Sequence, residues 1–226
     1  MSRLRAVRAV VLWTGGKDCA LALLRARRAG LDVDALVTFG PPRPRFRAHP
    51  LPRTRAQTRA LDLPHRFLSV TPPYAAGYER HFARLRREGY RAVVTGDIDL
   101  VACSPSWISD RARPTGLRVV RPLWRQSRRR LLRALAPAGI RAEITAVRSP
   151  YLGPEWLGRV LDPPMIEELL RLASLKGFDP SGEEGEYHTM VVDGPGFAAP
   201  VPRTRRAVRR ARDLWYLSAR PSPAAP

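Results

Sequence analysis

Val10-Val-Leu-Trp-Thr-Gly-Gly-Lys-Asp-Cys19 is an apolar run that ends in two glycines and a charged pair. An apolar run bounded by glycine predicts a buried strand. Gly15 and Gly16 carry no Cβ and can adopt positive φ, so the backbone can turn sharply and present its N–H groups. The apolar residues that follow predict a helix ending at Gly30, with one face formed by Ala20, Leu21, Leu23 and Leu24.

A strand, a glycine turn and a helix in this order form an anion site, because the positive end of the helix dipole points into the turn. Lys17 adds a mobile positive charge, and Asp18 can hold a magnesium ion that bridges phosphate oxygens. The alternative is a strand-to-helix turn that merely needs two glycines. The sequence favours a nucleotide phosphate site made of Thr14, Gly15, Gly16, Lys17, Asp18 and Cys19.

The first half of the chain alternates β-type and helical patterns. Strands are predicted over residues 7–13, 33–39, 65–70 and 92–95, and helices over 19–29, 54–61 and 74–88. Such alternation predicts an α/β fold with a doubly wound, mainly parallel sheet. Ligands bind beyond the carboxyl ends of such strands, where Asp97 follows the fourth predicted strand. We expect the Pro- and Arg-rich segment 41–52 to be a mobile lid.

The second half of the chain is organised differently. The patterns predict a helix over 127–136, a strand over 141–147, a helix over 163–176 and a strand over 190–192. We therefore expect an ATP-binding domain over 1–125, a smaller C-terminal α/β domain over 126–200, and a basic, Pro-rich tail over 201–226. We expect the tip of that tail to be disordered.

An acidic loop interrupts this otherwise basic second half. It reads Gly182-Glu-Glu-Gly-Glu-Tyr-His-Thr189, and its carboxylates can bind magnesium, orient a cation or act as a base. His188 is suited to proton transfer at neutral pH. The alternative is a solvated acidic turn with a capping histidine. We therefore treat Glu183, Glu186 and His188 as candidate catalytic residues beside Asp97.

Charge and cysteine content limit the class of protein. The net charge is +20, and 38 of the 40 basic residues are arginines, since only Lys17 and Lys176 are lysines. This excess fits a nucleic-acid-binding surface and GC-rich coding drift equally well. Two cysteines form no disulfide framework or zinc pattern, Arg8 interrupts a short N-terminal apolar run, and no stretch is long enough to span a membrane. These features predict a soluble, cytoplasmic protein.

Five motifs in the same order resemble the diphthine–ammonia ligase family, also called the diphthamide synthase ATP-binding family. This family belongs to the PP-loop ATP pyrophosphatases, whose fold is adenine nucleotide alpha hydrolase-like. Thr14 and Cys19 occupy the two serine positions of the superfamily signature Ser-Gly-Gly-x-Asp-Ser. The motifs are Thr14 to Cys19, Gly96-Asp97-Ile98, Pro122-Leu123-Trp124, Trp156-Leu157-Gly158-Arg159 and Gly182 to Pro195.

The resemblance implies an AMP-forming ligase that uses ATP and Mg²⁺. Such an enzyme adenylates the carboxylate of diphthine, a modified histidine on elongation factor 2, and ammonia then forms the amide. In this chain, residues 14–19 would hold the β and γ phosphates, and Asp18 and Asp97 the magnesium. Glu183, Glu186 and His188 would line the acceptor side, facing an elongation factor 2-like protein or a related acceptor.

Two other functions stay open. The first is a PP-loop ATPase that modifies tRNA, although nucleic acid is not the favoured partner. The second is an ATP-binding module without catalysis. The chain departs from the family after Ile98, where Leu100-Val-Ala-Cys-Ser104 replaces an acidic residue followed by arginine and glutamate. The sequence leaves the acceptor, the ammonia source and the oligomeric state undetermined.

Overall fold

The computed structural model describes residues 6–99, 106–202 and 206–219. Its internal contacts divide the chain into two compact units. The parallel-sheet unit comprises residues 1–14, 18–44 and 61–126, and the antiparallel-sheet unit comprises residues 15–17, 45–60 and 127–226. The turn that contains Gly15, Gly16 and Lys17 therefore packs with the second half of the chain, although both of its flanks belong to the first unit.

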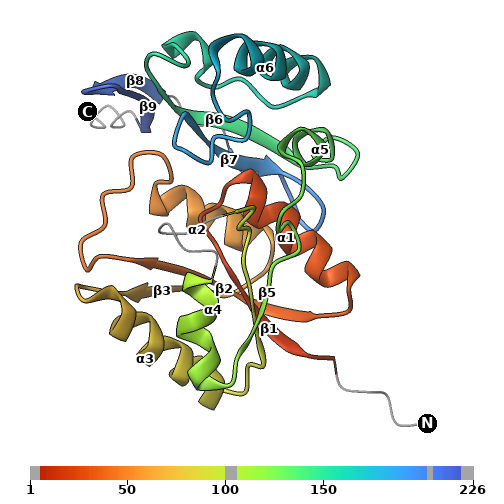
Figure 1. Ribbon diagram of the computed structural model, residues 1–226, viewed down its shortest axis with the longest axis vertical. Coiled ribbons are helices and arrows are strands. Elements are labelled where there is room, and N and C mark those ends of the chain that lie inside the picture. The colour runs from red at the N-terminus through yellow and green to blue at the C-terminus, as the bar shows by residue number, and fades with distance from the viewer. Residues whose placement is uncertain (1–5, 100–105, 203–205, 220–226) are drawn as a thin grey trace, which may run out of the picture. The chain divides into compact units, whose positions relative to one another are not determined.

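The parallel-sheet unit contains five strands in the order β3-β2-β1-β4-β5 (Figure 1). All of their pairings are parallel. The predicted parallel α/β sheet is confirmed, and one short strand, β5, was not predicted. The strands are β1 (Arg8–Leu12), β2 (Asp32–Gly40), β3 (His65–Ser69), β4 (Ala92–Val94) and β5 (Arg118–Val120).

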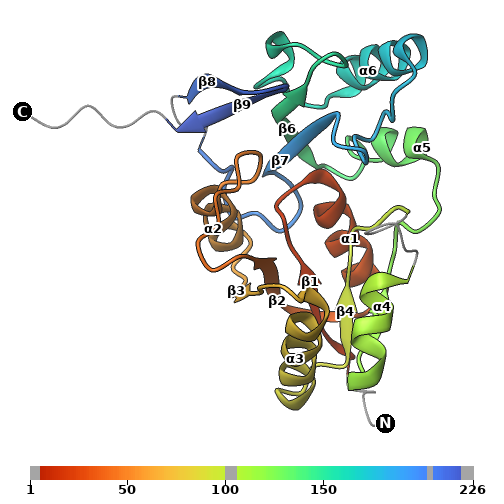
Figure 2. The ribbon, with the colours of Figure 1, turned by 60° about the vertical axis from the view of Figure 1, so that its left-hand side comes forward.

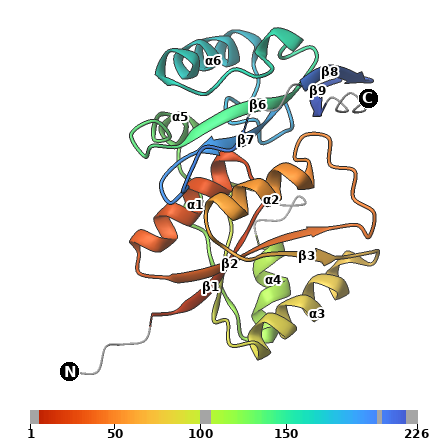
Figure 3. The same cartoon turned by 180° about the vertical axis from the view of Figure 1, so that it is seen from behind.

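Helices cover both faces of this sheet. Helices α3 (Tyr74–Arg87) and α4 (Trp107–Ala112) lie on one face, and α1 (Lys17–Arg28) lies on the other (Figures 1 and 3). A short 3₁₀ turn, Arg113–Thr115, follows α4. The core beneath α3 and α4 joins alternate strand residues to helix side chains, among them Val10, Val37, Val93, Phe82 and Ile108. The doubly wound arrangement therefore follows from strands that are apolar on both faces.

The antiparallel-sheet unit has four strands in the order β7-β6-β9-β8, and each neighbouring pair is antiparallel. They are β6 (Arg141–Arg148), β7 (Tyr187–Asp193), β8 (Arg206–Ala211) and β9 (Leu214–Ala219). The other elements of this unit are α2 (Leu51–Ala60), α5 (Arg128–Arg133), a 3₁₀ turn (Pro154–Trp156) and α6 (Pro163–Lys176), which lies over β6 (Figure 2).

Helix α6 has the predicted bounds because its sequence marks both ends. Asp162 caps the start by accepting a hydrogen bond from the Met165 amide at 2.9 Å, with proline at the first helical position. Gly177 ends the helix at φ 71°. Helix α5 is shorter than the predicted 127–136, ending at Arg133 before a series of turns.

Two segments differ from their predicted roles. The carbonyl of Ala48 accepts a hydrogen bond from the Thr145 hydroxyl at 2.8 Å, and α2 begins at Leu51, so part of the segment expected as a lid is fastened to β6. Residues 206–219, expected as a tail, form a hairpin whose Leu-Trp-Tyr-Leu run suits a strand. The expected disordered tip, residues 220–226, lies outside the described residues.

In the described ranges, no helix is long and apolar enough to cross a membrane.

Candidate nucleotide and acceptor site

The turn after β1 leaves no room for a side chain at Gly15. Its φ is +86°, and a Cβ there would lie 2.2 Å from Gln57 Oε1 and 2.9 Å from Met190 Cε. Gln57 cannot move aside easily, since it is fully buried and its Nε2 donates to the carbonyls of Gly15 at 2.8 Å and Val191 at 2.7 Å. The Val191 amide also donates to the Gly15 carbonyl, at 2.8 Å. Hydrogen bonds therefore connect the turn to both α2 and β7.

Lys17 links this turn to the acidic loop. It is 4% exposed, and its backbone amide donates to Thr189 Oγ1 at 3.1 Å. Its ammonium donates to the Ser181 carbonyl at 2.7 Å and lies 5.6 Å from the centroid of the Tyr187 ring. Ser181 Oγ is also buried and has no hydrogen-bond partner among the described residues. The structure thus brings Lys17 together with the acidic loop that the sequence assigned to the acceptor side alone.

Glu186 holds the acidic loop in place. The residue is 1% exposed, with Oε1 accepting from the Asp179 amide at 2.9 Å and Oε2 from the Glu184 amide at 3.1 Å. Both carboxylate oxygens are therefore bonded to backbone of its own loop, a geometry that favours positioning over contact with a substrate. Glu183, in contrast, is exposed at the surface of this loop.

His188 lies on β7 opposite Ala146 of β6. Its ring meets the His49 ring edge to face, with centroids 5.3 Å apart. Burial lowers the pKa of His188, and the positive charges of Lys17 and Arg148 lower it further. The imidazole is therefore neutral at neutral pH and able to accept a proton.

The remaining predicted site residues lie in the parallel-sheet unit. A Cβ on Gly96 would lie 2.8 Å from both the Asp18 carbonyl carbon and the Cys19 amide nitrogen, so the end of β4 contacts the first turn of α1. The structure thus brings the Asp97 segment beside Asp18. The exposed Thr14 hydroxyl donates to the sulfur of Cys19 at 3.8 Å, and Cys19 itself is buried.

Asp97 lies in a largely buried position beyond β4. Burial raises the pKa of its carboxyl group, while a 2.8 Å hydrogen bond from Thr95 Oγ1 and the charge of Arg121 oppose that rise. Arg121 follows β5 directly, and its guanidinium lies 3.9 Å from the centroid of the Trp124 ring. Arg121 was not predicted as a site residue, because the three-residue strand before it is too short to show a β-type sequence pattern.

Asp18 and Asp97 are hard oxygen donors, which suits magnesium. The described ranges contain no group of three or more histidine, cysteine, aspartate or glutamate side chains that could hold a metal ion. Magnesium in nucleotide sites usually takes one or two carboxylates and completes its shell with phosphate oxygens and water. The donor set fits a magnesium ion that arrives with a nucleotide.

An aromatic pocket of about 360 Å³ lies at the carboxyl ends of β2 and β3. This pocket was not predicted from the sequence. The rings of Phe39 and Tyr78 stack with centroids 4.0 Å apart, and Trp107 meets Tyr78 edge to face at 4.8 Å. Burial raises the pKa of Tyr78, and the negative charge of Asp97 raises it further. The pocket is lined by Phe39, Gly40, Pro41, Val70, Tyr74, Tyr78 and Trp107.

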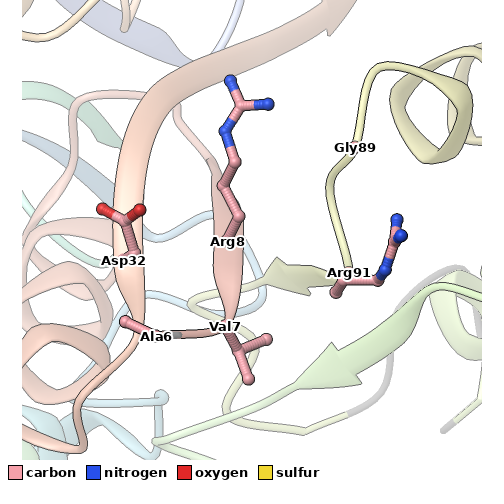
Figure 4. Close-up of a pocket in the computed structure, with 6 residues that line it drawn as sticks. All are labelled: Ala6, Val7, Arg8, Asp32, Gly89 and Arg91. Carbon is pink, nitrogen blue, oxygen red and sulfur yellow. The ribbon is translucent and has the colours of Figure 1, made fainter. Parts of the chain in front are cut away.

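A second depression, of about 540 Å³, lies at the amino end of β1 (Figure 4). Arg8 and Arg91 line it together with Asp32. The Arg8 guanidinium already bonds to Asp34 and to the Glu88 carbonyl. Parallel α/β sheets bind ligands at the opposite edge, so this depression is the weaker candidate for the nucleotide.

Residues 127–219 match the family model described as the diphthamide synthase C-terminal domain. Over this segment, the resemblance to the diphthamide synthase family is confirmed. The match extends past residue 200, so it includes the hairpin β8–β9.

Among solved structures, the chain is similar to a predicted subunit of tRNA methyltransferase from Methanocaldococcus jannaschii. The two share 15% sequence identity with a TM-score of 0.47, and the alignment covers 84% of this chain and 98% of that one. No curated protein matches the chain.

Gly15→Ala should loosen the turn, and Gly30→Ala is its matched control. Gly30 also has positive φ, at +81°, but a Cβ there meets nothing within 4 Å. Each substitution should cost roughly 1–2 kcal/mol of backbone strain, and only Gly15→Ala also displaces Gln57. Hydrogen exchange should therefore show faster exchange of the Val191 amide in Gly15→Ala alone. Equal protection of this amide in both variants would contradict the packing argument.

His188 should titrate below 6.5, the ordinary histidine pKa. Because it is neutral in the fold, unfolding below pH 6.5 takes up a proton. Its contribution to stability is therefore present above that pH and is lost as the pH falls through the lower, folded pKa. NMR titration of the imidazole should give a higher pKa in Lys17→Met, which removes a neighbouring charge, and no change in the exposed-site control Arg171→Met. An unchanged pKa in Lys17→Met would exclude the charge of Lys17 as a cause and leave burial and Arg148.

Proposed function

We propose that the protein binds ATP with Mg²⁺, adenylates a carboxylate with release of pyrophosphate, and forms an amide with ammonia. The acceptor we favour is diphthine on an elongation factor 2-like protein, or a related carboxylate. The observation that carries the proposal is the Gly15–Lys17 turn, held against β7 by Gln57 and by Lys17 itself. Support comes from the match of residues 127–219 to the diphthamide synthase C-terminal domain.

The proposed chemistry needs positive charge where pyrophosphate departs. A carboxylate is a poor electrophile, and its adenylate offers a better leaving group, AMP. Lys17 begins a 12-residue helix, so its ammonium and the helix N-terminus together favour the phosphates. Asp18 and Asp97 would hold the magnesium, which when bound neutralises charge on the phosphate oxygens.

The aromatic pocket suits the adenine base. Its volume of about 360 Å³ is large enough for a purine, and its aromatic walls provide flat surfaces for stacking. The charge of Asp97 acts on Tyr78 of this pocket. Gly96, the residue before Asp97, contacts the first turn of α1. We assign the base to this pocket.

On the acceptor side, His188 is the candidate base. Its lowered pKa keeps the imidazole neutral at neutral pH, so it can accept the proton that the attacking ammonia loses as the amide forms. Glu183 is exposed and can meet a cationic acceptor group. Glu186 acts indirectly, by holding the loop that carries Ser181 and Glu183.

The reaction products test the proposal directly. The purified protein should convert ATP to AMP and pyrophosphate when the acceptor and ammonia are present. Lys17→Ala should lower kcat by about 10²–10³, since it removes a charge at the departing phosphates. Lys176→Ala is the matched control, because this other lysine is exposed and donates to the carbonyls of Pro150 and Tyr151 at the surface. Formation of ADP and phosphate would refute the adenylation chemistry, and ATP binding without turnover would favour a non-catalytic module.

Tyr74→Ala tests the base pocket with little risk to folding, since Tyr74 is 53% exposed. Loss of one stacking surface should weaken ATP and adenosine equally, by about 3- to 10-fold, and leave tripolyphosphate binding unchanged. Calorimetric titration of the three ligands measures this, with Tyr151→Ala in the other unit as the control. If tripolyphosphate weakened as much as adenosine, the pocket would not hold the base.

A further inference from the structure

The hairpin β8–β9 concentrates positive charge on an exposed edge. Arg209, Arg210 and Arg212 are exposed, and Asp213 is the only acidic residue between positions 206 and 219. The Asp213 carboxylate lies 3.5 Å from Arg148 of β6. The charge of the three hairpin arginines is therefore not balanced locally.

Some other arginines of the same unit are paired. Arg128, Arg133 and Arg159 form ion pairs with Asp179, Glu167 and Glu168, at 3.0, 2.7 and 2.5 Å. In the part of the chain that the structure describes, Arg209, Arg210 and Arg212 have no carboxylate within ion-pair distance. Exposed arginines outside an ion pair also occur elsewhere among the described residues, Arg27, Arg28 and Arg130 among them, so what distinguishes the hairpin is the aromatic rings beside its arginines.

Aromatic rings lie beside these guanidinium groups. Arg210 lies opposite Trp215 across the hairpin, with its guanidinium carbon 4.9 Å from the ring centroid. Arg209 lies opposite Tyr216, and the Arg47 guanidinium carbon is 5.8 Å from the Tyr216 ring centroid. Both rings are partly exposed. Guanidinium groups bind phosphates and aromatic rings stack on bases, so the combination fits a nucleic-acid strand.

Strand β8 is the outermost strand of its sheet and pairs only with β9 among the described strands. Charged residues on an edge strand can serve merely to prevent pairing with another chain. That role requires charge alone. It gives no reason for partly exposed tryptophan and tyrosine beside the arginines, or for the approach of Arg47 from a separate segment.

We propose that this hairpin, together with Arg47, binds single-stranded nucleic acid. Because successive strand residues face opposite ways, Arg209 and Tyr216 lie on one face of the hairpin and Arg210 and Trp215 on the other. The nucleic-acid strand passes around the open edge of β8, where the arginines contact the phosphates and the two rings stack on bases. Recognition is by backbone charge and base faces, so it is tolerant of sequence. The surface is separate from the proposed ATP chemistry and does not depend on it.

The test measures binding of the full chain to fluorescent 12-nucleotide oligo(U) and oligo(dT) by anisotropy, over 50–200 mM salt. The hairpin variant carries Arg209→Ser, Arg210→Ser and Arg212→Ser. The matched control carries Arg27→Ser, Arg28→Ser and Arg87→Ser, which removes the same charge from exposed positions of the parallel-sheet unit. A third variant, Trp215→Leu, keeps the charge and removes one ring.

The hairpin variant should bind at least tenfold more weakly at 100 mM salt, with a salt slope smaller by about 2, at roughly 0.7 per phosphate contact. The control should bind nearly as the unchanged chain does. Trp215→Leu should lose roughly tenfold with its salt slope unchanged. Tighter binding of oligo(U) than of oligo(dT) would identify the strand as RNA, and the reverse would identify it as DNA.

Three results would overturn the proposal. Equal weakening in the hairpin and control variants would mean that only total charge matters. Equally tight binding of polyglutamate would make the hairpin a docking surface for acidic protein. Absence of oligonucleotide binding by the unchanged chain at 10 µM protein and 100 mM salt would exclude the interaction. If Trp215→Leu fails to fold, as judged by circular dichroism, the two arginine variants still decide.

Discussion

The carbonyl of Gly15 accepts hydrogen bonds from the Gln57 side chain and the Val191 amide, and the candidate site depends on this arrangement. Both donors are buried, so removing the acceptor would leave them unsatisfied at a cost of about 1–3 kcal/mol each. The same bonds fix where α1 begins. Lys17 lies two residues after Gly15, so these hydrogen bonds also determine where the Lys17 ammonium lies.

The position of Lys17 has an electrostatic consequence. A buried ammonium is costly unless hydrogen bonds and charges compensate for its lost hydration. Here the Ser181 carbonyl and the Tyr187 ring provide part of that compensation, and the charge of Lys17 lowers the pKa of His188. One side chain therefore serves both the expected phosphate site and the expected base. A phosphate that draws Lys17 away from Ser181 would also change the environment of His188.

Much of the fold could be predicted because its signals are local. The apolar run before Gly15 predicted β1, and Pro163 and Pro164 marked the start of α6. The features that were not predicted depend on distant partners. The sequence does not show that the Gln57 side chain bonds to the Gly15 and Val191 carbonyls, and strand β5 is too short to have a period. Glu186 resembled a catalytic acid because it lies among glycines, yet its oxygens bind the amides of Asp179 and Glu184.

The same distinction applies to charge. The composition shows that arginines are numerous, but only the fold determines which of them form an ion pair with a carboxylate. Arg53 reaches the buried Glu143 at 3.0 Å, an ion pair in which the arginine offsets the cost of burying the acid. Arg210 reaches a tryptophan face and the carbonyl of Arg212. The charge of a guanidinium paired with a buried acid is neutralised within the fold. A guanidinium over an exposed ring keeps its charge available to a ligand. Net charge alone therefore cannot identify the partners of this protein, and the pairing of individual arginines can.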